Sequence, residues 1–136
     1  MNQTKYGFGA EVQMPYDEAV GRTKELLQAE GFGMLTEIDV QKTMKQKLNV
    51  EFRKYVILGA CNPHLAHRAF EAELEIGLLL PCNVAVYEDA GGSVVSIMDP
   101  LAVLGVVGNE RLRPVTEEAR ARLERVVRKL SQRVKV

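Results

Sequence analysis

Apolar and polar positions alternate near the start of the chain with the period of a β-strand. Between Tyr6 and Gln13, every second residue from Phe8 to Val12 is apolar, which predicts a strand with one buried face. The period then changes to three and four. This second pattern begins at Pro15, a residue suited to the first turn of a helix, and ends at Gly31. The chain therefore begins with a strand and a helix that ends in a glycine cap.

A second strand and a short helix are expected next. Phe32–Ile38 has strand character, and Asp39 is placed to cap a helix whose apolar residues, from Val40 to Leu48, share one face. Tyr55–Ala60 is a continuous apolar run. Such a run indicates a strand that is buried on both faces, at the centre of a sheet.

Signals for the start of a helix occur twice in the second half of the chain. Asn62 followed by Pro63 predicts the cap and first turn of a helix. The side chains that this helix buries are expected to be Leu65, Ala66, Ala69 and Phe70. Asp99–Pro100 repeats the pattern in front of a short apolar helix that Gly105 can end.

The chain is expected to end with a hairpin and a long helix. Asn83–Glu88 and Ser93–Met98 read as strands around the turn residues Asp89–Gly92. After a linker that contains Pro114, we expect Thr116 to cap the last helix. The buried stripe of this helix is predicted to comprise Ala119, Leu123, Val126, Val127, Leu130 and Val134.

Together these elements predict one α/β (α+β) domain that spans residues 1–136. Single helices between strands, with one hairpin, favour a two-layer sandwich with a mixed β-sheet. A chain of 136 residues, of which 46% are hydrophobic, can bury one core and is too short for two domains. Its two cysteines cannot staple a domain of this size.

The sequence shows no secretory or membrane-spanning segment. Met1–Tyr6 is polar with no apolar run behind it. The longest apolar runs, Ile76–Leu80 and Leu101–Val107, fall short of the roughly 20 residues that cross a bilayer. We therefore expect a soluble cytosolic protein in which Cys61 and Cys82 are free thiols. Leu101–Val107 is apolar enough for a pocket wall or a subunit interface, and we expect it to contribute to the core and to a homodimer.

The net charge of zero conceals a division of charge along the chain. From residue 111 onward there are nine basic and three acidic residues, which gives +6, and residues 1–110 carry −6. A basic helix can bind nucleic acid, but this one has no aromatic residue. Glu118 with Arg122, and Glu124 with Arg128, are spaced to pair on the helix itself. We therefore expect the last helix to complement the acidic body or a second subunit, and we expect no nucleic-acid partner.

The residues best suited to chemistry gather around the two cysteines. Cys61 ends the predicted central strand just before a helix N-terminus, where the helix dipole favours a thiolate. His64 and His67 follow on that helix, and Glu71 lies four residues beyond His67. With Cys82 these side chains would suit zinc or copper.

The same residues also have an ordinary structural interpretation. Buried free cysteines are common at strand ends, and histidines on a solvent-facing helix need no ligand. The spacing matches no established zinc motif. A nucleophilic pair of Cys61 and His64 would also need an oxyanion hole and a third positioned group, which the sequence does not show. We therefore expect no bound cofactor.

Two glycine pairs are better explained by backbone geometry than by nucleotide binding. Gly91–Gly92 joins two predicted strands and lacks the helix and lysine of a phosphate loop. Gly7 and Gly9 lie in or beside the first strand, where a bulge or a close backbone contact is expected. Neither pair predicts a nucleotide site.

Four segments give the sequence a family resemblance. Ala60–Pro63, Ile76–Val84 and Asp99–Pro100, together with the Met14–Ala19 segment that follows the first strand, resemble the bacterial and archaeal domain of unknown function family 302. The resemblance implies an α/β domain, often a homodimer, with no established activity. It marks as site or scaffold positions Cys61, Asn62, Pro63, Pro81, Cys82, Asp99 and Pro100.

We expect a small homodimeric domain that binds a small ligand near Cys61 and Cys82, with no membrane partner. The candidate ligand-binding residues are Cys61, Asn62, Pro63, Pro81, Cys82 and Asp99. The first alternative is a thiol-redox or metal-dependent enzyme whose candidate metal ligands are His64, His67, Cys61 and Cys82. A second alternative is a structural or interaction scaffold. This alternative gains ground if the molecule has no pocket of roughly a few hundred cubic ångströms.

Overall fold

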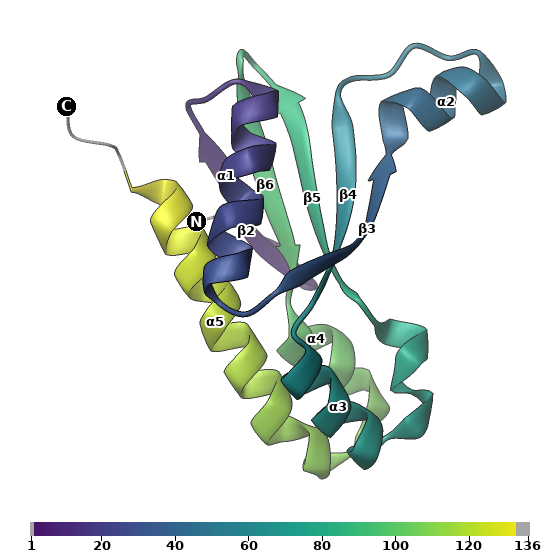
Figure 1. Cartoon of the computed structure of the whole chain (residues 1–136), viewed down its shortest axis with the longest axis vertical. Helices are drawn as coiled ribbons and strands as arrows, with labels where there is room; N and C mark the ends of the chain where they lie inside the picture. Colours follow the sequence, from purple (N-terminus) through teal and green to yellow (C-terminus); the bar gives the residue numbers. More distant parts are fainter. Residues whose placement is uncertain (1, 133–136) are drawn as a thin grey trace.

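The computed structural model describes residues 2–132 and shows one sheet with helices on one face and at its ends (Figure 1). The strands are β1 (Asn2–Gln3), β2 (Gly7–Val12), β3 (Gly33–Asp39), β4 (Tyr55–Cys61), β5 (Cys82–Asp89) and β6 (Gly92–Met98). The α-helices are α1 (Tyr16–Ala29), α2 (Val40–Leu48), α3 (Pro63–Ala72), α4 (Pro100–Leu104) and α5 (Arg113–Ser131). Three short 3₁₀ helices are η1 (Leu74–Leu79), η2 (Gly105–Val107) and η3 (Glu110–Leu112).

The predicted α+β class is confirmed, but the sheet differs from the predicted mixed one. The six strands lie in the order β1-β2-β6-β5-β4-β3, and each neighbouring pair is antiparallel. Alternation of strands and helices suggests parallel neighbours only when each helix crosses over the sheet. Here α1 connects β2 to β3, which lie four positions apart in the sheet order, and α2 lies beyond the strand ends. The chain therefore turns back between neighbouring strands.

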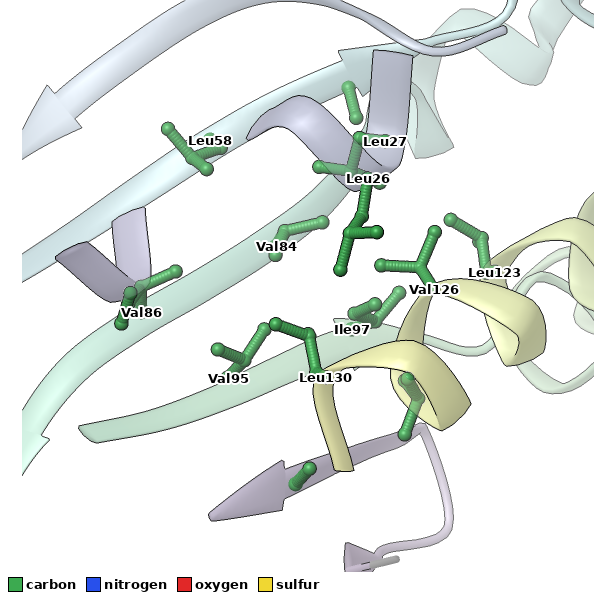
Figure 2. Packing of buried hydrophobic residues seen from close by; sticks show 14 of the residues in the cluster. Leu26, Leu27, Leu58, Val84, Val86, Val95, Ile97, Leu123, Val126 and Leu130 are labelled. Carbon is green, nitrogen blue, oxygen red and sulfur yellow. The ribbon is translucent and has the colours of Figure 1, made fainter. Parts of the chain in front are cut away.

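The main hydrophobic core lies between the sheet and the two helices α1 and α5. Figure 2 shows leucines of α1 and apolar residues of α5 directed toward the central strands. Among these, Leu27, Leu58 and Leu123 are fully buried. This side of the sheet carries the alternate apolar residues of β2, β4, β5 and β6, as the period of two requires. The core residues that Figure 2 labels are Leu26, Leu27, Leu58, Val84, Val86, Val95, Ile97, Leu123, Val126 and Leu130.

A second, smaller core lies beyond the lower end of the sheet in the view of Figure 1. It gathers apolar residues of α3, η1, α4, η3 and the first turns of α5, and its buried members are Leu65, Ala69, Ile76, Leu104, Leu112, Val115 and Ala119. The helix α5 takes part in both cores, because Val115 and Ala119 belong to the smaller one and Leu123 to Leu130 to the larger.

Two of the predicted helix caps, Asp39 and Asn62, are present in the structure. The side chain of Asp39 accepts a hydrogen bond from Lys42 N, and Asn62 accepts one from Leu65 N. Ala90 and Gly91 both have positive φ, so the hairpin between β5 and β6 turns in two residues, as expected for a type I′ turn. The close backbone contact expected at Gly9 is also present, since a Cβ there would lie 2.0 Å from Val95 O.

The start of the last helix differs from the prediction. α5 begins at Arg113 and has Pro114 in its first turn, so Pro114 is not in a linker and Thr116 is not the cap. Proline fits a first turn because it has no N–H to leave unpaired. Thr116 is buried, and its hydroxyl donates to Arg113 O. Val134, predicted to end the buried stripe, lies outside the described residues.

The basic last helix pairs with the acidic body, as the charge division predicts. Arg125 donates to both carboxylate oxygens of Glu30 at 2.9–3.1 Å. On α5 itself, Glu118 pairs with Arg122 as expected. Glu124 pairs with Arg120, one turn earlier, and not with the predicted Arg128. No helix within residues 2–132 is both long enough and apolar enough to cross a membrane.

Candidate functional site

An apolar cavity of about 250 Å³ lies between the two cores. The end of β4 and the start of β5 form one wall, and α3, η1, α4 and α5 form the others. Within residues 2–132 no charged side chain lines this cavity. The lining consists of Phe32, Leu35, Ala60, Cys61, Asn62, Leu65, Ala66, Ala69, Phe70, Gly77, Leu80, Pro81, Cys82, Pro100, Leu104, Val115, Thr116 and Ala119.

Both cysteines contribute to this cavity, from adjacent strands. Ala60 and Cys82 lie directly opposite each other in the β4–β5 ladder, so their side chains share the core side of the sheet. Cys61 is the next residue, and its side chain alternates to the other side. Both thiols are free. The cysteines therefore line one cavity without sharing a face of the sheet.

The surroundings of both thiols oppose the thiolate form. Burial, with a smaller contribution from nearby Cys61, raises the pKa of Cys82 to about 11. Burial also raises the pKa of Cys61. This direction is opposite to the one expected for Cys61 at the α3 N-terminus, because burial disfavours the charged form of the thiol. At neutral pH both groups are neutral thiols, which are weak nucleophiles and weak metal ligands.

The candidate metal ligands are not brought together. His64 and His67 are both exposed on α3, and His67 Nδ1 lies 3.6 Å from Glu71 Oε1. Cys82 is buried. The described part of the chain contains no group of three or more His, Cys, Asp or Glu side chains placed to hold a metal ion. The geometry therefore gives no support to a zinc or copper site at these residues.

Asn62 and Thr116, the polar residues of the lining other than the cysteines, each form a hydrogen bond within the fold. Asn62 is buried, and its Oδ1 accepts from Leu65 N at 3.2 Å. The Thr116 hydroxyl is engaged with Arg113 O. No buried side-chain nitrogen or oxygen atom in residues 2–132 lacks a partner. The cavity thus offers a ligand mainly apolar contacts, with two thiols as weak polar groups.

Four of the six candidate ligand-binding residues line the cavity, namely Cys61, Asn62, Pro81 and Cys82. The other two do not. Pro63 is exposed in the first turn of α3. Asp99 is buried, caps α4 through Leu101 N, and forms an ion pair with Arg120. Asp99 is therefore a structural residue, whereas its neighbour Pro100 does line the cavity.

Sequence reasoning identified part of the remaining wall, since Leu104 belongs to the apolar run Leu101–Val107, but it missed other positions. Phe70 was expected in the core, but its side chain is 38% exposed and lines the cavity. Leu35 is 66% exposed. It lies where the β3–β4 register shifts between Met34 and Thr36, and such a bulge redirects a side chain. A break in the alternation of β3 was the one available signal for this position.

Comparison with known proteins agrees with this architecture. The chain is similar to the crystal structure of an uncharacterised conserved DUF302 protein from Bacillus stearothermophilus, with a TM-score of 0.86 and 26% sequence identity. The match covers 93% of this chain and 99% of that one. A search of curated proteins finds no match. Residues 8–130 match the family model described as Domain of unknown function DUF302, and the chain therefore belongs to this family.

Proposed function

We propose that this chain is one protomer of a homodimer that binds a small, neutral and largely apolar molecule in the cavity between its two cores. The proposal rests on the cavity, whose lining is uncharged within the described residues. An ionised ligand group would lose its hydration there without gaining a partner. A neutral ligand loses little and gains contact with the apolar walls.

The size of the cavity narrows the class of ligand. A cavity of about 150 Å³ lined by Leu, Ile and Phe residues holds a benzene molecule. At about 250 Å³, this cavity suits a somewhat larger molecule, such as a bicyclic aromatic ring or a short acyl chain. Both thiols are weak hydrogen-bond donors and can contact a polar atom of the ligand without demanding a charge. A cytosolic setting is part of the proposal, because free cysteines suit a reducing compartment.

The cavity favours ligand binding over the two alternatives. A scaffold does not need an internal space of this size. A thiol-redox or metal-dependent enzyme needs an ionised thiol or a cluster of ligands. The raised pKa values of Cys61 and Cys82 disfavour an ionised thiol.

Indole is a suitable test probe, because the chain contains no Trp and the fluorescence of bound indole is separate from that of the protein. We expect saturable binding with a blue-shifted emission. Ala66→Leu adds a side chain to the wall at a half-buried lining position. It should weaken indole binding by about tenfold or more, because the added carbons occupy the ligand's space.

Ala121→Leu is the matched control, since Ala121 is exposed in the middle of α5 and does not line the cavity. This variant should bind indole as the original chain does. The absence of saturable binding, or equal loss of binding in both variants, would overturn the proposed site.

A further inference from the structure

The exposed apolar side chains of this protein are concentrated in two segments. In the described part of the chain ten large hydrophobic residues are exposed, and eight of them lie in residues 33–54 or residues 70–79. We call residues 33–54 the arm; it consists of β3, α2 and the loop that leads to β4. We call residues 70–79 the acidic segment; it consists of the end of α3 and η1. Clustering of this kind marks an interaction surface, whereas scattered exposed residues do not.

The arm is basic and has little core of its own. α2 has no buried residue, and Leu48, Val50 and Phe52 are 40–66% exposed. Residues 33–54 contain five basic residues and three acidic residues, which gives a charge of +2. Glu51 pairs with Lys45 and Glu37 with Lys24, both at 2.7 Å, whereas Lys42 and Lys47 are exposed. The arm is thus an apolar surface edged by positive charge.

The acidic segment has the opposite charge and even more exposed apolar groups. Leu74 and Leu78 are 78% and 83% exposed. Residues 70–79 contain Glu71, Glu73 and Glu75 and no basic residue, which gives −3. Two residues outside the segment contact Glu71: Arg111 donates to its backbone oxygen, and His67 Nδ1 lies 3.6 Å from its Oε1. The segment is thus an apolar surface edged by negative charge.

The two surfaces lie on the same side of the molecule, at opposite ends of one sheet edge. Figure 1 shows α2 and the segment that contains η1 on the right of the view, above and below β3. β3 is the last strand of the sheet. Leu35 bulges from this strand and lines the cavity, as do Phe70 and Gly77 of the acidic segment. The exposed part of the cavity wall therefore faces the space between the two surfaces.

We propose that the arm of one protomer packs on the acidic segment of a second copy, in a two-fold dimer that covers the exposed side of both cavities. This inference rests on the proposed function, which it deepens by naming the dimer surface. A two-fold axis near β3 places each arm opposite the partner's acidic segment, so one contact occurs twice. The bulge at Leu35 opposes simple pairing of two β3 edges, so side chains form the contact.

Charge complementarity is the reason to choose a second copy. A surface of +2 and a surface of −3 on one chain attract each other across a dimer. A lipid surface with anionic headgroups would attract the arm and repel the acidic segment. In this dimer Leu48 and Phe52 of the arm cover Leu74 and Leu78 of the partner, and all four side chains become buried.

Charge reversal tests the surface by measuring the dimer dissociation constant in sedimentation equilibrium. Lys42→Glu with Lys47→Glu gives an arm-reversed chain, and Glu71→Lys with Glu75→Lys gives a segment-reversed chain. Each alone should raise the dissociation constant by about tenfold or more, because like charges then face each other. An equimolar mixture of the two should dimerise again, since both contacts in the mixed dimer unite opposite charges.

Arg128→Glu with Lys129→Glu is the matched control for the arm-reversed chain, because it makes the same change in net charge at exposed positions of α5. This variant should dimerise normally, and circular dichroism checks that all variants are folded. A monomeric original chain, normal dimers of both reversed variants, or failure of the mixture to dimerise would overturn the inferred surface.

Indole binding separates this inference from the proposed function. If the partner covers the cavity, the reversed variants should bind indole more weakly by about tenfold, and the mixture should recover the affinity. If monomer and dimer bind indole equally, the partner does not cover the cavity, although the cavity remains a ligand site. A normal dimer that does not bind indole would overturn the ligand site and leave the dimer surface.

Discussion

Asp99 and Arg120 form a partly buried ion pair that ties the end of the sheet to the C-terminal helix. The other oxygen of the Asp99 carboxylate accepts from Leu101 N at 2.9 Å and caps α4. The Arg120 guanidinium also contacts Glu124 and lies 5.1 Å from the centre of the Phe8 ring. The Asp99 carboxylate thus contacts the start of α4 and Arg120 of α5. Through Arg120 it is also linked to Phe8 of β2.

Replacing Asp99 should destabilise the fold more than a surface substitution does. Asp99→Ala removes the cap of α4 and one partner of Arg120, and we expect a loss of about 2–3 kcal/mol in the free energy of unfolding. Asp99→Asn keeps an oxygen for Leu101 N and should cost about half as much. Urea denaturation measures both. Equal stability of the two variants would show that the cap contributes nothing.

The Glu30–Arg125 pair should make stability depend on pH in the acid range. The hydrogen bond from Arg125 lowers the pKa of Glu30 below its ordinary value of 4.5. Because the folded pKa is the lower one, the stabilisation is present above the unfolded pKa and is lost as the pH falls through the folded pKa.

Comparison with Glu30→Gln tests this dependence. The difference in the free energy of unfolding between the original chain and the variant should shrink between about pH 6 and pH 3. Glu117→Gln is a control at an exposed position of α5 and should show no such trend. A difference that stays constant across this range would contradict the contribution of the pair.

The thiol of Cys82 should react slowly in the folded protein. A shift of its pKa from 9.0 to about 11 reduces the thiolate fraction near neutral pH by about a hundredfold, and burial restricts access further. Ellman's reagent at about pH 8 should modify Cys82 at least about a hundredfold more slowly in the folded protein than in urea. The variants Cys61→Ser and Cys82→Ser show which kinetic phase of the reaction belongs to which thiol. Rapid modification of Cys82 in the native state would revive the thiol-redox alternative.

Gly9 should not tolerate a side chain, whereas Gly21 should. A Cβ on Gly9 would lie 2.0 Å from Val95 O and 2.9 Å from Ser96 Cα, both in the neighbouring strand β6. Gly9→Ala should therefore cost about 2–3 kcal/mol by forcing the strands apart. A Cβ on Gly21 of α1 meets nothing within 4 Å. Gly21→Ala should stabilise the chain by about 0.5–1 kcal/mol through helix propensity. Thermal unfolding of the two variants gives the comparison.

Local signals in the sequence predicted most elements of the fold. Asp39, Asn62 and Asp99 each cap a helix, because a cap depends only on the next three residues. The direction of the strands was not predictable in this way. It depends on which strands become neighbours, and β2 and β3 lie far apart in the sheet although α1 joins them.

The candidate site was predicted only where it coincides with the ends of strands. Cys61 and Cys82 were expected to lie together because each borders a predicted strand, and both do line the cavity, although from different faces of the sheet. Val115 and Ala119 also line the cavity, and they belong to α5, which begins about 30 residues after Cys82. Their place depends on how α5 packs across both cores, which the period of one helix does not reveal.

The position of α5 has a consequence for how the molecule unfolds. Its first turns close the smaller core and its later turns close the larger one. If this helix detached from the rest of the fold, both cores would be exposed to solvent at once. Neither core can therefore unfold while the other stays fully packed. A single 19-residue helix thus makes two separate apolar clusters behave as one cooperative unit.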